Sequence, residues 1–180
     1  MTRELLTLAS TRSAARGAER LFRRERVRIR RRVPRAIIVH VGATAVRGLP
    51  TKGDLDIVVR VEPAEFAQAE RALAAMYERN TGSDRTATFA AFKADDRTTP
   101  LGVQLVAIAS DHDDFDLLTD QLRVSSNCKR KLGRLKRRFA GRPMERYRAA
   151  KARVIGEIFE REPLATLAAS RRSSGKTRKN

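Results

Sequence analysis

Two aspartates, Asp54 and Asp56, stand at the start of the apolar run LDIVVRV, directly after a stretch punctuated by glycines. Side chains alternate along a strand, so both carboxylates face one side while Leu55 and Ile57 enter the core. Carboxylates held this close repel each other, and such pairs usually need a cation. Mg²⁺ commonly binds through one or two carboxylates together with substrate phosphates. The pair therefore predicts a magnesium site with Asp54 and Asp56 as its ligands.

The segment before the aspartates, HVGATAVRGLPTKG, is typical of a phosphate-binding turn. An apolar strand ends at Gly42, where the backbone can approach a ligand closely and a helical turn can begin with free N–H groups. We expect Gly42, Ala43 and Thr44 to cradle phosphates, and Arg47 and Lys52 to neutralise them. Gly-Asp-x-Asp alone often just opens a strand as a polar turn. Its combination with the glycine turn favours a nucleotide and metal site.

The amino-acid composition indicates which kinds of partner and which cellular compartment to expect. The chain has 180 residues and a formal charge of +18, from 39 Lys and Arg against 21 Asp and Glu. This balance favours nucleotides or nucleic acid as partners, and the alternative is charge solvated on helix faces. The lone Cys128 cannot form an internal disulfide, and no apolar run approaches the roughly 20 residues that span a bilayer. We expect a cytoplasmic protein with no membrane segment.

The hydrophobic pattern predicts a first helix, then the strands of a small sheet with one long helix between them, and then helices only. The expected helices cover residues 14–32, 64–78, 114–124, 126–140 and 144–160, and the expected strands cover 36–41, 55–61, 86–94 and 101–109. The last two strands should form an antiparallel pair. We divide the chain into a core of residues 1–112 with a loosely held start over 1–10, a helical part over 113–160, and a disordered basic tail over 161–180.

The acidic strand GDLDIVV resembles the metal-binding strand of nucleotidyltransferases of the polymerase-beta type. More narrowly, VHVGATAVRGLPTK resembles the GrpB-like family, whose members read HIGSTAVPGLxAK at this place. The segments DQLR and LKRRFA are similar to later motifs of that family. The matching positions are His40, Gly42, Thr44, Ala45, Val46, Gly48, Leu49 and Lys52, with Tyr147, Lys151, Val154 and Ile155 in its closing motif.

This resemblance implies an α/β (α+β) nucleotidyltransferase-like fold, a small mixed sheet backed by helices, with a C-terminal helical bundle. It also implies Mg²⁺-dependent transfer of a nucleoside monophosphate from an NTP to a hydroxyl acceptor that the sequence does not identify. The residues expected to contribute to a substrate cleft are His40, Gln104, Tyr147 and Lys151.

Three residues depart from the pattern that the resemblance implies. Ala43 replaces a serine that contacts phosphate, and Arg47 replaces a proline, which adds a cation. Gln104 occupies the position where active nucleotidyltransferases carry a third carboxylate. A glutamine amide cannot act as a general base at neutral pH, so the catalytic set is incomplete by this alignment.

Two features of the alignment stay open. By position in the chain, a carboxylate could be supplied instead by Asp95, Asp96 or Asp111. In an alignment without gaps, the aspartate of the GrpB-like family motif corresponds to Asp56. Asp54 is then an extra carboxylate, which fits the pattern of the wider nucleotidyltransferase superfamily better.

Two other functions are compatible with the sequence. One is a catalytically degenerate nucleotide-binding or nucleic-acid-binding protein that uses its basic helices, with arginine and lysine concentrated over residues 23–32 and 129–138. The other is an accessory module linked to coenzyme A metabolism, because some members of the family that it resembles are fused to dephospho-CoA kinase.

Overall fold

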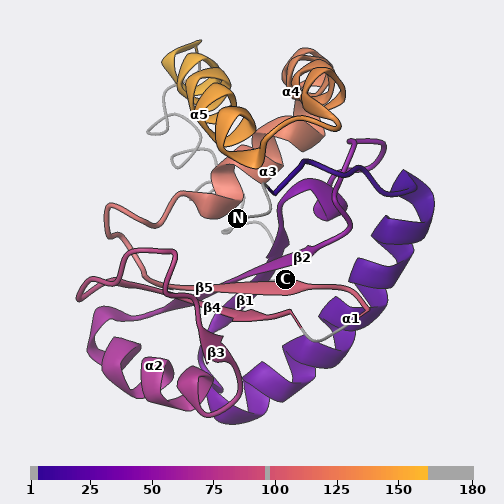
Figure 1. The fold of residues 1–180 in the computed structure, drawn as a ribbon. Coiled ribbons are helices and arrows are strands. Elements are labelled where there is room, and N and C mark those ends of the chain that lie inside the picture. Colours follow the sequence, from indigo (N-terminus) through magenta and orange to yellow (C-terminus); the bar gives the residue numbers. More distant parts are fainter. Residues whose placement is uncertain (1–3, 96–97, 162–180) are drawn as a thin grey trace, which may run out of the picture.

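The computed structural model describes residues 4–95 and 98–161. A five-stranded sheet in the order β1-β2-β5-β4-β3 lies between helices on both faces (Figure 1). The elements are α1 (Thr11–Arg32), β1 (Ile37–Val41), β2 (Leu55–Val61), α2 (Phe66–Ala74), β3 (Glu78–Arg79), β4 (Phe89–Ala94), β5 (Leu101–Ala107), α3 (Phe115–Val124), α4 (Ser126–Phe139) and α5 (Met144–Arg161). β2 and β5 run parallel, and the other neighbouring pairs run antiparallel. The predicted mixed sheet, backed by helices and followed by C-terminal helices, is confirmed.

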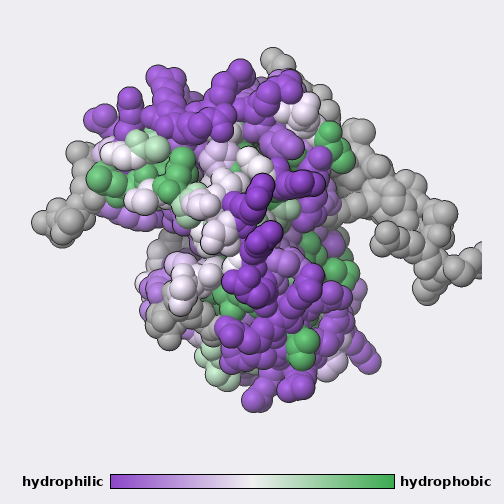
Figure 2. Space-filling view, turned by 90° about the vertical axis from the view of Figure 1, so that its right-hand side faces the viewer, coloured by the Kyte–Doolittle hydropathy of each residue, from purple (hydrophilic) through white to green (hydrophobic). Residues whose placement is uncertain are grey.

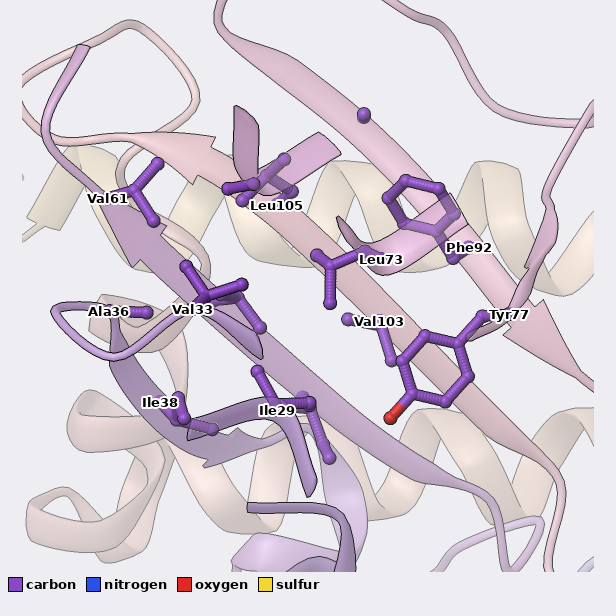
Figure 3. Packing of buried hydrophobic residues seen from close by; sticks show 14 of the residues in the cluster. Ile29, Val33, Ala36, Ile38, Val61, Leu73, Tyr77, Phe92, Val103 and Leu105 are labelled. Carbon is purple, nitrogen blue, oxygen red and sulfur yellow. The ribbon is translucent and has the colours of Figure 1, made fainter. Parts of the chain in front are cut away.

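The main core lies between the sheet and the layer formed by α1 and α2. Alternation along β2 places Leu55 and Ile57 on this face, and both are fully buried, as the sequence pattern predicts. Figure 3 shows Ile29 of α1 and Leu73 of α2 directed towards the sheet. Full burial of each such side chain contributes about 1.5–3 kcal/mol to the free energy of unfolding. This core fixes β2, and therefore the carboxylates at its start.

The helix expected over residues 64–78 is shorter in the structure. A 3-10 turn at Pro63–Glu65 leads into α2, which ends at Ala74. Tyr77 is buried, and its hydroxyl donates a hydrogen bond of 2.8 Å to Oε2 of Glu25 on α1. This core contact turns the chain out of the helix, so Glu78 begins β3. The expected strand over 86–94 also starts later, at Phe89.

The expectation of a loosely held start is wrong for residues 4–10. Leu6 is 1% exposed and packs against Met144 and Tyr147. The N–H of Leu6 donates to the carbonyl of Arg142, and the N–H of Ala9 donates to the carbonyl of Thr51. The segment thus ties the α4–α5 junction to the loop that precedes Asp54.

Two expectations concern the ends of the chain and the membrane. Apart from residue 161, where α5 ends, the expected basic tail lies outside the described residues. The helical part was expected to follow residue 112, and α3 begins three residues after that residue. Within residues 4–95 and 98–161, every helix is too short or too polar to cross a bilayer.

Candidate functional site: an acidic pair under a glycine turn

The turn after β1 is shaped by Gly42. Its φ of 77° and ψ of −166° lie in a region that is essentially restricted to glycine. Its N–H donates a hydrogen bond of 3.1 Å to Oγ1 of Thr119 on α3. A Cβ atom at this position would lie 2.3 Å from Oδ2 of Asp56. The close approach expected at Gly42 is therefore an approach of the backbone to the Asp56 carboxylate.

A cavity of about 110 Å³ lies above the acidic pair, between the turn and the C-terminal helices. It joins residues far apart in the sequence, because α3, α4 and α5 all contribute side chains to it beside the loop between β1 and β2. Its lining comprises Gly42, Ala43, Leu49, Lys52, Asp54, Asp56, Leu118, Thr119, Leu122, Leu132, Lys136, Tyr147 and Lys151. Seven residues expected at the site from the sequence thus share one cavity.

Positive charge surrounds the two carboxylates. Burial and the neighbouring charge of Asp54 raise the pKa of Asp56 to about 6, although Lys151, Lys136 and Lys52 oppose that shift. The Nζ atom of Lys52 lies 3.6 Å from Oδ2 of Asp54. Three lysines and two aspartates line the cavity, so its net charge favours a bound anion.

Lys136 is the most buried of these lysines. It is 7% exposed, and burial, with the nearby charge of Lys151, lowers its pKa to about 8. The two aspartates act in the opposite direction, so Lys136 stays mainly charged at neutral pH. An ammonium that is held away from water and faces a cavity interacts strongly with a phosphate oxygen.

Tyr147 and Lys151 lie one helical turn apart on α5 and both line the cavity. Burial, together with the charge of Asp54, raises the pKa of Tyr147 to about 12. The phenol therefore keeps its proton at neutral pH and acts as a hydrogen-bond donor or acceptor. Contact with Leu6 and Met144 holds its ring in place.

Thr44 and His40 support the turn from the side that faces α1. The Thr44 hydroxyl donates to the carbonyl of Asp54 at 3.0 Å and accepts from Nε2 of His40 at 3.0 Å. Nδ1 of His40 lies 3.6 Å from Oε2 of Glu19, while burial lowers the pKa of His40. These contacts link α1 to the loop of the acidic pair, and neither side chain lines the cavity.

We expect Thr44→Val to destabilise the protein by about 2–3 kcal/mol, because it leaves the buried Nε2–H of His40 and the carbonyl of Asp54 without their partner. Urea unfolding at neutral pH measures the change in the free energy of unfolding. Thr44→Ser keeps the hydroxyl and is the control. Equal stability of the two variants would show that the hydroxyl does not hold the loop.

Gln104 occupies the strand next to the acidic pair. β5 runs parallel to β2, with Gly102 opposite Asp56. A Cβ atom at Gly102 would lie 3.1 Å from Oδ1 of Asp56 and 3.3 Å from Nε2 of Gln104, so both side chains cover this glycine. Among the described residues, Oε1 of Gln104 is one of the buried polar atoms without a hydrogen-bond partner.

The other expected sources of a third carboxylate lie elsewhere. Asp95 pairs with Lys93 at 3.1 Å, and its side chain is 62% exposed. Asp111 is exposed in the loop after β5, and Asp96 falls outside the described residues. Neither Asp95 nor Asp111 lines the cavity.

The donors at the acidic pair fit a single Mg²⁺ ion. The described part of the chain contains no group of three or more His, Cys, Asp or Glu side chains placed to hold a metal. Asp54 and Asp56 supply carboxylate oxygens, whereas Gln104 does not line the cavity, and the amide atom that approaches the side of Asp56 is its Nε2. Mg²⁺ keeps several water or phosphate ligands, so few protein donors are sufficient.

Sequence reasoning missed Lys136 and Thr119 as residues of the site. Lys136 belongs to the basic run over residues 129–138, which the sequence offers as a nucleic-acid surface or as charge solvated on a helix face, and not as part of the acidic site. The available signal was its position four residues after Leu132, on the apolar side of the helix. Thr119 carries no such signal, since only the packing of α3 against the turn brings its hydroxyl to Gly42.

Arg47 lies apart from the carboxylates. It lines a larger groove of about 720 Å³ between the first half of α1 and the segment Thr44–Gly48. Gly42 and Ala43 face the acidic cavity, whereas Thr44, Ala45 and Arg47 face this groove. The turn therefore separates two adjoining concave surfaces.

The fold and site define an α/β protein with an acidic pair beneath a glycine turn, covered by C-terminal helices. Residues 14–161 match the family model described as GrpB protein, and the chain belongs to the GrpB family. The family resemblance seen in the sequence is confirmed.

This chain is also similar to individual proteins and solved structures. A UPF0157 protein of Vibrio cholerae is 28% identical over 144 residues, which are 79% of this chain and 76% of that protein. The crystal structure of the conserved protein GrpB from Enterococcus faecalis superposes with a TM-score of 0.64 at 17% identity, over 80% of this chain and 93% of that one. The Cid1 poly(U) polymerase with bound MgGTP gives a TM-score of 0.47 at 13% identity, over 68% of this chain and 41% of that one.

Proposed function

We propose that the protein transfers a nucleoside monophosphate from an NTP to a hydroxyl acceptor in a reaction that depends on Mg²⁺. The observation that carries this proposal is the single cavity that joins Asp54 and Asp56 to Lys52, Lys136 and Lys151. Carboxylates supply a metal site, and lysines supply a site for phosphate oxygens. A cavity with both is suited to a triphosphate and its cation.

Asp54 and Asp56 would hold the metal, which supplies charge compensation for the triphosphate. Lys136 and Lys151 neutralise phosphate oxygens, and Lys52 adds a third cation at the edge. The acceptor oxygen forms a bond to the α-phosphorus. At the same time, the bond breaks between that phosphorus and the oxygen that bridges the α- and β-phosphates. Pyrophosphate leaves with the electron pair of that bond, and the hydroxyl proton passes to solvent.

The size of the cavity restricts what it can hold. At about 110 Å³ it is smaller than the roughly 300–1,000 Å³ typical of pockets that enclose a whole ligand. It suits a cation with phosphate groups, and the nucleoside would extend beyond it. We therefore expect the phosphates to dominate binding and the four NTPs to bind with similar affinity.

Isothermal titration with each NTP, with Mg²⁺ and with a chelator, tests this proposal. We expect binding that needs Mg²⁺ and that Asp54→Asn weakens by at least about 10-fold, the lower end of losses at perturbed metal sites. Asp84→Asn, which alters an exposed aspartate in the turn after β3, is the control of equal charge change. Equal binding with and without Mg²⁺, or no binding, would overturn the proposal.

A nucleotide-binding protein without transfer activity is the second candidate, and Gln104 favours it. This amide lies beside Asp56, and unlike a carboxylate it cannot accept the proton of the acceptor hydroxyl at neutral pH. Pyrophosphate release separates the candidates. Mg²⁺-dependent NTP binding without release, across a range of hydroxyl acceptors, would favour the binding protein.

A further inference from the structure

The groove beside the acidic cavity carries arginine in a regular pattern. Arg12, Arg16, Arg20 and Arg23 recur every three or four residues along one face of α1, and Arg47 faces them from the opposite wall. Three or four residues of helix advance by about 5–6 Å, so these guanidinium groups form a line. All of these arginines are exposed. Figure 2 shows the side of the molecule along which α1 runs, and hydrophilic residues cover most of it.

Most of this charge is not neutralised by other residues that the structure describes. Arg23 pairs with Glu19 at 2.9 Å, and Glu19 is the one acidic residue among the described residues that line the groove. Within residues 4–95 and 98–161, Arg12, Arg16, Arg20 and Arg47 have no ion-pair partner. By contrast, Arg28 on another face of the same helix is bound to the buried Glu25. The groove therefore presents a row of free cations.

The groove leads to the loop of the acidic pair. A Cβ atom at Gly53 would lie 3.4 Å from Cβ of Ala9 and 3.8 Å from Cβ of Ala14, so the start of α1 adjoins the residue before Asp54. The first turn of α1 contains no acidic residue, which leaves the positive end of its dipole uncompensated. Positive charge thus continues along the helix towards the carboxylates.

We propose that this groove binds the phosphate backbone of a single-stranded nucleic acid and directs its end towards Asp54 and Asp56. Cations that repeat along a concave surface match phosphates that repeat along a strand. Among the described residues, the lining of the groove contains no aromatic side chain on which bases could stack. The aromatic ring of Phe22 lies in an adjoining pocket, beside His40. Binding is therefore governed by charge and independent of base sequence.

The inference rests on the proposed function only for the role of the strand, whose terminal hydroxyl would be the acceptor. Binding to the groove is a separate property that needs neither Mg²⁺ nor NTP. Nucleic-acid binding without NTP binding would support the proposal for the groove and contradict the proposed transfer reaction. NTP binding without nucleic-acid binding would support nucleotide binding in the acidic cavity and contradict a nucleic-acid strand as the acceptor.

Fluorescence anisotropy with labelled single-stranded RNA and DNA of about 15 nucleotides tests the groove, in chelator and without NTP. Between about 50 and 200 mM salt, we expect affinity to fall steeply, with a slope of about −0.7 for each phosphate contacted. The triple variant R12Q/R16Q/R20Q should bind at least about 10-fold more weakly at low salt, with a slope shallower by about 2 units.

The matched control is R130Q/R134Q/R138Q, which removes three arginines at the same helical spacing from α4. We expect it to retain the affinity and the salt slope of the wild type. Absence of binding by the wild type, or a greater loss in the α4 variant than in the α1 variant, would overturn the proposal. Stronger binding of RNA than DNA, or the reverse, identifies the source of the strand.

Discussion

Asp56→Asn is expected to stabilise the metal-free protein at neutral pH and to remove Mg²⁺-dependent nucleotide binding. The folded state raises the pKa of Asp56 from 3.8 to about 6, chiefly by burial and by the charge of Asp54. Ionisation of Asp56 is therefore unfavourable to folding. An amide of the same shape carries no charge and therefore removes this cost.

The sign of the pH dependence follows from the raised pKa. Between about pH 4 and pH 6, the folded state holds a proton on Asp56 that the unfolded state has lost, so wild-type stability falls as pH rises through this window. A shift of about two pKa units corresponds to at most about 3 kcal/mol, and partial solvent access reduces it to about 1–3 kcal/mol. Asp56→Asn should match the wild type near pH 4 and exceed it above pH 6.

Urea unfolding in chelator, from about pH 4 to pH 8, measures this difference. Asp84→Asn is the control, because an exposed carboxylate changes stability by less than about 0.5 kcal/mol. Titration with Mg²⁺ and NTP gives the second readout, in which we expect at least about 100-fold weaker binding by Asp56→Asn. A variant that is less stable than the wild type above pH 6, or that binds nucleotide normally, would contradict this account of Asp56.

The sequence was sufficient for the residues whose environment is set by local pattern. Alternation along β2 places Leu55 and Ile57 in the core and leaves Asp56 on the other face. The helical spacing of Tyr147 and Lys151 places both on one side of α5, and the structure brings them to the cavity. These positions depend on the period of a strand or a helix, which the sequence carries directly.

Other positions depend on contacts between distant segments, which the pattern of a single sequence does not contain. Lys136 reaches the acidic pair only because α4 turns its apolar side, with Leu132, towards Val46 and Leu49 of the β1–β2 loop. The Thr44 hydroxyl was expected to bind phosphate, but it donates to the carbonyl of Asp54, because His40 and the loop converge on it. Tyr77 ends α2 early through a hydrogen bond to Glu25, fifty-two residues away in the chain.

Gly42→Ala is expected to give the largest loss of stability, together with loss of nucleotide binding. The φ and ψ of Gly42 fall in a region that costs other residues about 1–3 kcal/mol. The added Cβ would also lie 2.3 Å from Oδ2 of Asp56, so the carboxylate must move. We expect a total loss of about 2–6 kcal/mol in the free energy of unfolding, which sums backbone strain and a steric contact in a packed site.

Gly48→Ala separates the two causes. Gly48 has a φ of 79°, but a Cβ atom there would have no atom of a described residue within 4 Å, so this variant tests a positive φ without the steric contact. It should lose about 1 kcal/mol and keep Mg²⁺-dependent NTP binding, because the acidic cavity is untouched. Unfolding in urea and titration with NTP, applied to both variants, measure the contribution of the Asp56 contact as their difference. If Gly42→Ala binds nucleotide as well as Gly48→Ala does, the position of the Asp56 carboxylate is not what the turn provides, and the site must be assigned to other residues of the cavity.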